Sequence, residues 1–277
     1  MVDRSVYAAA ADAIRQARVL VITAGAGMGV DSGLPDFRGD RGFWNAYPMY
    51  ERLGLSFVDA ANPAHFEADP AFGWGFYGHR LRMYRATEPH AGFAMLRRWA
   101  DRFELATFVV TSNVDGQFQK AGFDDQRIVE VHGSIHHLQC TTPCGHDVWP
   151  NDDEVEVDES DMRALTVPLC PRCGGVARPN ILMFGDYAWI SRRTQAQRDR
   201  FEAFLAELDG APLVVIEMGA GTSIPTIRHT SESLGQRGRV IRINPREPDI
   251  GGGHLSIPAG ALEGLTGIDR ALGPSVV

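Results

Sequence analysis

Short, continuous apolar runs recur along the chain and are separated by longer amphipathic segments. The apolar runs lie at 18–24, 105–111, 128–131, 212–219 and 239–244. Each fits a strand of a parallel sheet covered on both faces, because neither side of the run carries polar residues. The amphipathic segments, with apolar residues at helical spacing, lie at 5–17, 91–102 and 192–208. This alternation predicts an α/β fold with a doubly wound, Rossmann-like parallel sheet.

Two segments interrupt the alternation. Residues 40–89 are rich in aromatic side chains with scattered turn residues, which predicts a helical insert that covers a cleft. Residues 136–186 contain all the cysteines and an acidic run, NDDEVEVDESD, which we expect to form a solvated surface loop. The remaining segments, 1–39, 90–135 and 187–277, would form the Rossmann-like domain.

The charge balance argues against a nucleic-acid ligand. The chain has 277 residues, with 35 acidic against 27 basic side chains, and no run of Lys and Arg that would capture a phosphate backbone. The first 17 residues alternate charge with alanine and lack the apolar core of a signal peptide, and no run of about 18 apolar residues occurs. We therefore expect a cytoplasmic protein with no membrane partner.

The four cysteines occur as two close pairs. Cys140 and Cys144 form a C-x3-C pair, and Cys170 and Cys173 follow 25 residues later as a C-x2-C pair. In a reducing compartment such pairs indicate a metal site rather than disulfides. Four thiolates fill every position of a tetrahedral site, so we expect one structural Zn2+ in a small zinc-ribbon domain. Free or redox-active cysteines are the alternative.

A glycine-rich turn follows the first predicted strand directly. In AGAGMGV, Gly25, Gly27 and Gly29 would let backbone N–H groups approach a phosphate at the start of a helix. Val30 occupies the last glycine position of the G-x-G-x-x-G fingerprint, so the cofactor geometry must differ from that of a dehydrogenase. A merely tight turn is the alternative.

Polar residues beside this turn favour a nucleotide ligand. Asp36, Phe37 and Arg38 stand together in LPDFRG, and an acid, an aromatic ring and a guanidinium suit a sugar and a pyrophosphate. A surface loop with an internal Asp–Arg pair is the other interpretation. After the second predicted strand, Asn113 and Asp115 alternate across one residue and together match the donor and acceptors of a carboxamide. N-V-D-G is also a good turn sequence by itself.

The motifs occur in a series that spans residues 18 to 250. In chain order they are GAGMGVDSGLPDFRG, TSNVDGQFQKAG, VHGS, the two cysteine pairs, RPNILMFGD, GAGTS and RIN. This series resembles the sirtuin (Sir2) family of NAD-dependent protein deacylases, of the bacterial type. The resemblance implies NAD as co-substrate and an acyl-lysine protein or peptide as partner.

The resemblance assigns roles within the histidine-rich stretch EVHGSIHHLQC. His132 matches the family's general base, which acts through the nicotinamide ribose, and an ordinary pKa of about 6.5 suits that task. His136 and His137 receive no catalytic or metal-binding role. The resemblance also implies two further sets of residues. The NAD pocket would comprise Gly25, Ala26, Gly27, Asp36, Phe37, Arg38, Ser112, Asn113, Asp115, Gly221, Thr222, Ser223 and Asn244, with Asn113 also catalytic. Phe184 and Gly185 would lie where the family adds a substrate peptide as an extended strand.

A Y-x-x-R pattern bears on the acyl group. Tyr77 and Arg80, in FYGHR, are similar to the pair in sirtuins that remove succinyl, malonyl or glutaryl groups. A guanidinium and a phenol could clamp the terminal carboxylate of such a chain. The same spacing arises readily by chance on a helix, so deacetylation, desuccinylation or both remain open.

The chain also departs from the family pattern. Ser112 replaces a glutamine, Gln117 and Phe118 replace a leucine and a histidine, and Thr226 and Arg228 stand where a valine and a proline are usual. These changes touch the ribose site and the peptide loop. They leave open a mono-ADP-ribosyltransferase or NAD glycohydrolase on the same fold, and also a non-catalytic NAD sensor.

Overall fold

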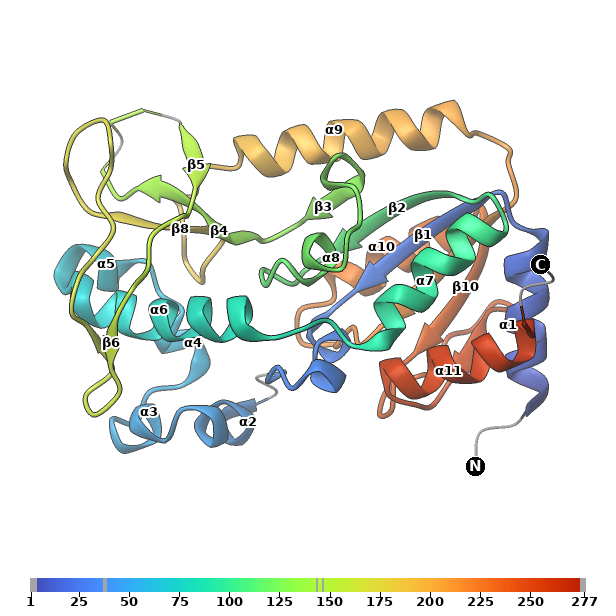
Figure 1. Cartoon of the computed structure of the whole chain (residues 1–277), viewed down its shortest axis with the longest axis horizontal. Helices are drawn as coiled ribbons and strands as arrows, with labels where there is room; N and C mark the ends of the chain where they lie inside the picture. The colour runs from blue at the N-terminus through green and yellow to red at the C-terminus, as the bar shows by residue number, and fades with distance from the viewer. Residues whose placement is uncertain (1–3, 37–38, 143, 146, 275–277) are drawn as a thin grey trace.

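The chain forms two lobes, and the long helix α9 (Arg192–Glu207) runs beside both of them (Figure 1). The computed structural model describes residues 4–36, 39–142, 144–145 and 147–274. Within these residues, no helix is long and apolar enough to span a membrane. Phe37 and Arg38, two of the expected cofactor residues, lie outside the described part.

The larger lobe is built on a six-stranded parallel sheet in the order β11-β10-β9-β1-β2-β3. Its strands are β1 (Val19–Ala24), β2 (Ala106–Thr111), β3 (Ile128–Glu130), β9 (Leu213–Met218), β10 (Gly238–Ile243) and β11 (Leu255–Ile257). The five predicted apolar runs are thus confirmed as strands. The edge strand β11 was not predicted, because its three residues follow a glycine-rich stretch and give no continuous apolar signal.

Helices cover both faces of the sheet, which confirms the doubly wound arrangement (Figure 1). One face packs on α1 (Arg4–Gln16), α7 (Ala91–Arg102) and α11 (Ala261–Leu272). The other packs on α9 (Arg192–Glu207) and α10 (Thr226–Gly235). The three predicted helices agree with α1, α7 and α9 to within one residue, whereas α10 and α11 were missed. Polar residues dominate α10 and two glycines interrupt α11, and both features weaken the helical signal.

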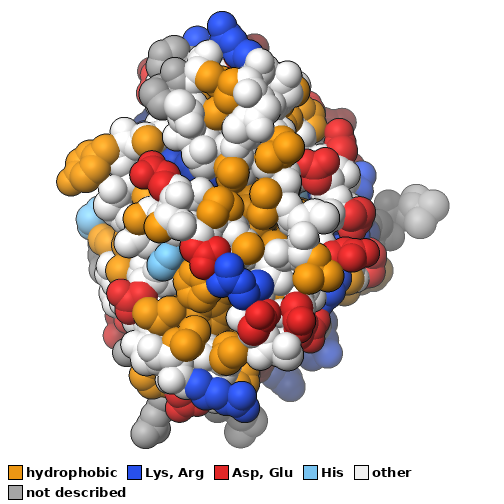
Figure 2. Space-filling model, turned by 90° about the vertical axis from the view of Figure 1, so that its left-hand side faces the viewer, with side chains coloured by type: hydrophobic (Ala, Val, Ile, Leu, Met, Phe, Trp, Pro, Cys, Tyr) orange, Lys and Arg blue, Asp and Glu red, His pale blue; other side chains and the backbone are white. Residues whose placement is uncertain are grey.

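The smaller lobe combines both interrupting segments. Its antiparallel sheet has the order β5-β4-β8, with β4 (Gly133–Cys140), β5 (Val148–Pro150) and β8 (Ala177–Ile181). The helical insert contributes α2 (Gly39–Ala46), α3 (Pro48–Arg52), α4 (Phe57–Ala60), α5 (Ala64–Ala68) and α6 (Pro70–Ala86). At this end of the molecule, apolar side chains run across a surface that also carries acidic and basic groups (Figure 2).

The insert and the cysteine-containing segment share one hydrophobic core. Trp74 and Tyr77 of α6 lie in the same cluster as Ile135 and Leu138 of β4. The acidic run is mostly exposed, as expected, but Val155 within it is buried in this core, and a short hairpin of β6 (Val157–Asp158) and β7 (Arg163–Ala164) follows. The two segments therefore depend on each other for burial.

In the described part of the chain, the edge strand β3 has no neighbouring strand on its outer side, and side chains of α9 hydrogen-bond to its backbone there. The N–H of Glu130 donates to Gln197 Oε1 at 3.1 Å, and its carbonyl accepts from Thr194 Oγ1 at 3.1 Å. These bonds replace the strand neighbour that β3 lacks. They also fix the backbone two residues before His132.

Candidate functional site

The strand register brings most of the expected site residues to one edge of the sheet. Ala24 pairs with Thr111 on one side and with Met218 on the other, and Thr111 pairs with Glu130. The turns that begin at 25, 112, 131 and 219 therefore leave the sheet side by side. This is the carboxyl edge, where parallel α/β sheets bind ligands.

Two of these turns touch each other at glycines. A Cβ on Gly27 would lie 2.6 Å from the Cα of Gly219, and one on Gly25 would lie 2.8 Å from the Gly219 carbonyl oxygen. The N–H of Gly27 donates to that carbonyl at 3.1 Å. Close packing of turn on turn thus requires glycine here, whatever the turn binds. That reason could not be read from the local sequence, because the two turns are almost 200 residues apart.

The expected carboxamide pair is held by the neighbouring turns. The amide Nδ2 of Asn113 donates to the Gly25 carbonyl at 3.1 Å, which joins the second strand's turn to the first. Asp115 is 8% exposed, and its Oδ1 accepts from the N–H of Gln117 at 2.9 Å. Burial, with a smaller contribution from Glu130, raises the pKa of Asp115 to about 6. Asp115 is therefore ionised at pH 7 at a cost in stability.

His132 stands at the end of the third strand of this edge. Its carbonyl accepts from the N–H of Leu182 at 2.9 Å, and its side chain is half-buried. Burial lowers the pKa of His132, a hydrogen bond with the backbone of Ser112 opposes this, and the charge of Arg198 lowers it further. The imidazole is consequently neutral near pH 7, which is the state that a general base needs.

Polar side-chain contacts link the turns after β1, β9 and β10. Asp36 Oδ2 pairs with Arg246 Nη2 at 3.1 Å, and Thr222 Oγ1 donates to Glu247 Oε1 at 2.7 Å. The side chain of Asn244 is fully buried. It donates to the Ala220 carbonyl at 2.9 Å and accepts from the N–H groups of residues 246 and 247, both at 3.0 Å. Direct contact between Asn244 and a ligand would require these hydrogen bonds to open.

Two more expected residues sit on this rim. Gly221 is half-buried, and Ser223 is exposed at the start of the loop before α10. Arg228, one of the departures from the family pattern, is buried and donates to the carbonyls of Ala220 at 3.2 Å and Glu247 at 2.6 Å. It therefore ties the loop after β9 to the loop after β10, a role that no sequence signal indicated.

Arg80 lies inside the small lobe among aromatic rings. Its guanidinium donates to the hydroxyl of Tyr84 through Nε at 3.1 Å and Nη2 at 2.6 Å. It also lies 5.1 to 5.9 Å from the ring centroids of Phe57, Phe76, Tyr77 and Tyr84. Tyr77 and Arg80 are thus neighbours, as the Y-x-x-R spacing on a helix requires, and Tyr84 one turn further orients the cation.

The expected peptide loop is fixed by a buried ion pair that sequence reasoning missed. Arg178 of β8 and Asp186 form two hydrogen bonds of 2.7 and 2.8 Å, with side chains 2% and 0% exposed. Asp186 Oδ2 also accepts from the N–H of Met183 at 3.3 Å. Phe184 packs edge-to-face on Phe57, with ring centroids 5.9 Å apart, and Gly185 adopts a left-handed φ of 67°. In the sequence, the pair appears only as an arginine and an aspartate eight residues apart, at the two ends of RPNILMFGD.

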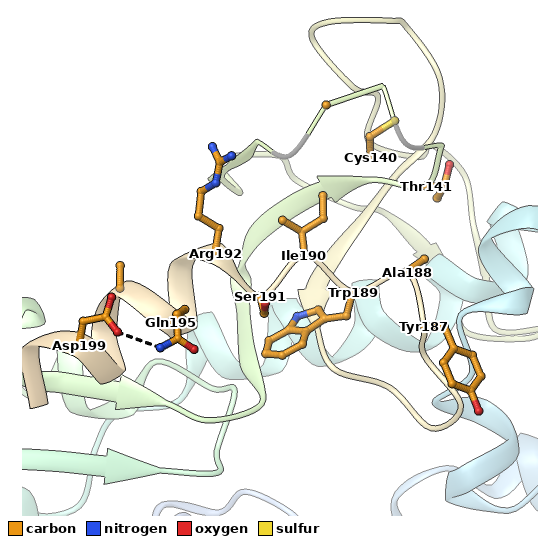
Figure 3. Close-up of a pocket in the computed structure, with 12 residues that line it drawn as sticks. Cys140, Thr141, Tyr187, Ala188, Trp189, Ile190, Ser191, Arg192, Gln195 and Asp199 are labelled. Atoms are coloured by element: carbon orange, nitrogen blue, oxygen red, sulfur yellow. Dashed lines mark hydrogen bonds between the residues drawn. The ribbon is translucent and has the colours of Figure 1, made fainter. Parts of the chain in front are cut away.

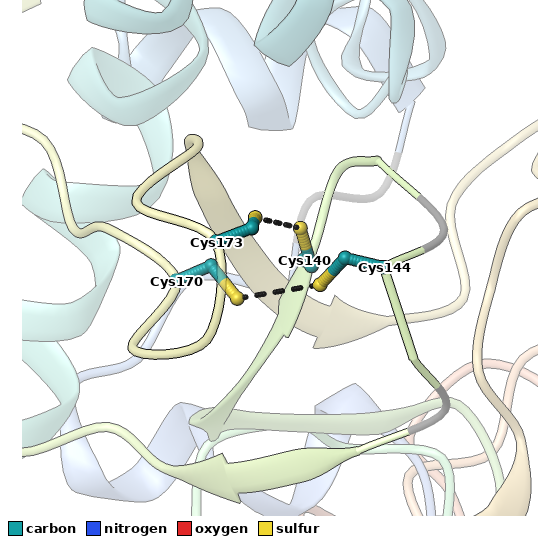
Figure 4. Close-up of side chains that lie close together, drawn as sticks. All are labelled: Cys140, Cys144, Cys170 and Cys173. Atoms are coloured by element: carbon teal, nitrogen blue, oxygen red, sulfur yellow. Dashed lines mark hydrogen bonds between the residues drawn. The ribbon is translucent and has the colours of Figure 1, made fainter.

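The four cysteines converge as predicted (Figure 4). The sulfur atoms of Cys140 and Cys173 lie 3.6 Å apart, as do those of Cys144 and Cys170, and all four lie within 4.8 Å of one another. Tetrahedral zinc with Zn–S bonds of about 2.3 Å places its sulfur ligands about 3.8 Å apart. The residues therefore fit one closed zinc site.

A separate cavity of about 780 Å3 lies between the cysteine cluster and the start of α9 (Figure 3). Trp189 and Ile190 line it from the loop before α9, and Cys140 lines it from β4. Gln139 holds that loop, since it donates to the Ala188 carbonyl at 2.9 Å and accepts from the Ile190 N–H at 3.0 Å. None of the expected cofactor or substrate residues that the structure describes lines this cavity.

Comparisons with known proteins identify the family and the fold. The Sir2 family model matches residues 25–215. An NAD-dependent protein deacylase of Pseudomonas aeruginosa is 32% identical, over 83% of this chain and 84% of the relative. One from Archaeoglobus fulgidus is 31% identical, over 86% of this chain and 85% of the relative. A solved complex of a mutant Sir2 homologue with ADP ribose superimposes with a TM-score of 0.68 over 95% of both chains, at 25% identity. The extent of the family match and the identity to these relatives lead to one conclusion: the chain belongs to the Sir2 family.

Proposed function

We propose that this chain is an NAD-dependent protein-lysine deacylase with His132 as its general base. The observation that carries the proposal is the position of His132. The residue follows the carboxyl end of β3, its carbonyl accepts from the Leu182 N–H, and burial lowers the pKa of its side chain. A neutral imidazole beside the expected carboxamide residues is the arrangement that this reaction requires.

The cofactor would bind at the carboxyl edge of the sheet. When bound, NAD supplies the nicotinamide–ribose bond whose cleavage drives acyl transfer from lysine. Asn113 and Asp115 would hold the carboxamide, since an amide and a carboxylate together provide a donor and acceptors. The rest of the dinucleotide would be held by Gly25, Ala26, Gly27, Asp36, Phe37, Arg38, Ser112, Gly221, Thr222, Ser223 and Asn244.

His132 would take a proton from a ribose hydroxyl through a ring nitrogen. The backbone around it is fixed on two sides, by the Leu182 N–H on its carbonyl and by α9 side chains on Glu130. A base held this way needs little reorganisation before proton transfer. Such positioning lowers the free-energy barrier by several kcal/mol, and by up to ~7–11 kcal/mol in well-oriented cases.

The acyl-lysine substrate would lie along residues 182–185. Leu182 presents an apolar side chain, 39% exposed, directly beside the His132 backbone, and Phe184 with Gly185 follows. The buried pair of Arg178 and Asp186 closes the turn at Phe184 and Gly185 that ends this segment, and a peptide strand would lie beside it. Tyr77 and Arg80 would then contact the far end of an acidic acyl chain.

The zinc ion has a structural role in this proposal. All four tetrahedral positions are filled by Cys140, Cys144, Cys170 and Cys173, so no position is left for a substrate. The ion would clamp the ribbon that carries β4 and β8, and hence the segment on which the peptide lies.

The proposal is tested by incubating the protein with NAD, with and without acetyl-lysine and succinyl-lysine peptides. We expect nicotinamide release that depends on the peptide, together with O-acyl-ADP-ribose detected by mass. Nicotinamide release that ignores the peptide would instead favour ADP-ribosyl transfer or glycohydrolysis. NAD binding without any turnover would favour a sensor.

A further inference from the structure

His136 contacts the turn that holds Asp115. It lies on β4, four residues after His132, and its Nε2 lies 2.9 Å from the Asp115 carbonyl oxygen. Because a carbonyl only accepts, Nε2 must carry the ring proton. The second-strand turn of the large lobe is therefore bonded to the first strand of the small lobe.

The ring also packs directly on the following residue. Gly116 has a left-handed φ of 72°, and a Cβ there would lie 2.6 Å from Cδ2 of His136. A second hydrogen bond, from the N–H of Ile135 to the carbonyl of Val114 at 3.0 Å, runs beside the first. Only glycine permits this approach of ring to backbone.

On its other side the same turn is tied to the end of α6. The amide Nε2 of Gln117 donates to the Thr87 carbonyl at 3.2 Å, and Lys120 Nζ donates to the carbonyls of Arg85 and Thr87, both at 2.9 Å. Asp115 Oδ1 in turn accepts from the Gln117 N–H. The turn is thus held between α6 and β4, and on the β4 side it is held by the His136 ring and the Ile135 N–H.

The surroundings keep the ring neutral. Burial lowers the pKa of His136, the hydrogen bond with Asp115 opposes this, and Arg85 and Arg193 lower it further while Glu130 raises it. A single ring proton, placed on Nε2, is what the bond to the carbonyl requires.

We propose that His136 is a positioning residue for the nicotinamide end of NAD. It sets the place of Asp115 through the backbone and does not touch the cofactor itself. This inference rests on the proposed function, in which Asp115 binds the carboxamide. Loss of His136 would remove one of the two hydrogen bonds between β4 and the turn, the one made to Asp115 itself, and weaken recognition of the nicotinamide group, while the adenosine and phosphate contacts at the other turns stay intact.

The test compares two ligands by calorimetry in the full chain. ADP-ribose lacks nicotinamide, so it reports only on the rest of the pocket. We expect His136→Leu to raise the Kd for NAD roughly five- to tenfold, the loss of about one hydrogen bond, and to change the Kd for ADP-ribose less than about twofold. His136→Gln keeps an N–H donor at similar reach and should restore NAD binding to within about threefold of wild type.

The neighbouring histidine provides a matched control. His137 precedes Leu138 on the same strand, has its Nδ1 buried without a hydrogen-bond partner, and makes no contact with Asp115 among the described interactions. His137→Leu should leave both dissociation constants within about twofold of wild type. If His136→Leu fails to fold, His136→Ala provides the same comparison without a donor.

Two results would overturn the inference. One is an unchanged Kd for NAD in His136→Leu, and the other is equal weakening of NAD and ADP-ribose, which would indicate general loosening. Both differ from a failure of the proposed function, in which wild-type protein would show no peptide-dependent nicotinamide release. Binding constants are measured without peptide, so the two outcomes are separable.

Discussion

Arg178 and Asp186 form a two-bond ion pair that is almost completely buried, across the loop that would receive the substrate peptide. Removing one partner leaves a charge without compensation in the interior. We expect Arg178→Met to lower the free energy of unfolding by about 3–5 kcal/mol, measured by urea denaturation. The exposed pair of Arg163 and Asp69 has similar bond lengths, 2.7 and 2.8 Å, so Arg163→Gln serves as control and should cost under about 1 kcal/mol. Similar costs for the two variants would contradict the role of burial.

The acid limb of the rate profile should report on His132. The base is active when neutral, so kcat measured with saturating NAD and peptide should fall as pH drops through its pKa, which burial lowers from the usual value of about 6.5. Arg198 lowers this pKa further, so Arg198→Gln should move the limb to higher pH. An acid limb well above pH 6.5 in wild type would contradict the assignment.

Asp115→Asn should stabilise the protein while impairing NAD binding. Because burial raises the pKa of Asp115 to about 6, against about 3.9 when unfolded, ionisation opposes folding as pH rises through 6. Removing the charge should add up to about 3 kcal/mol of stability at pH 8 and little at pH 4. Thermal unfolding at both pH values measures the difference, and an equal gain at each would exclude ionisation as its cause.

Arg80 should determine the preference between acyl chains. We expect Arg80→Met to lower kcat/KM for a succinyl-lysine peptide by roughly 10- to 100-fold, and to change deacetylation far less, because a carboxylate loses a charge-assisted partner. Arg82 lies on the same helix, half exposed and paired with Glu159, so Arg82→Met is the matched control. Undiminished succinyl activity in Arg80→Met would rule out the clamp.

The zinc site should be needed for folding and not for chemistry itself. We expect one equivalent of zinc by elemental analysis, and a loss of metal and of thermal stability in Cys170→Ser. Because the site is closed, substituting cobalt for zinc should leave kcat within about twofold. A large change in kcat with the metal would place it in the reaction.

Much of the fold could be predicted because its signals are local. Continuous apolar runs marked five strands, and helical periodicity marked α7 at its observed bounds. The cysteine spacing anticipated the cluster, and the ends of the apolar runs marked the turns that carry His132 and Asn113.

What remained hidden depends on contacts between distant segments. Gly27 is glycine because Gly219 lies against it, and no local pattern reveals that neighbour. Gln117, which departs from the family pattern, donates to the carbonyls of Tyr84 and Thr87 at the end of α6. Phe118, the adjacent departure, is buried against Phe93, with ring centroids 4.9 Å apart. The insert and the ribbon looked like separate units, yet both contribute side chains to one core.

The central claim is most directly tested by single-turnover formation of O-acyl-ADP-ribose in His132→Ala, with NAD binding measured in parallel. We predict a rate reduced by roughly 10²–10⁴ with the Kd for NAD within about threefold of wild type. A rate close to wild type, or an equal loss of rate and of NAD binding, would contradict the role of His132 as the base.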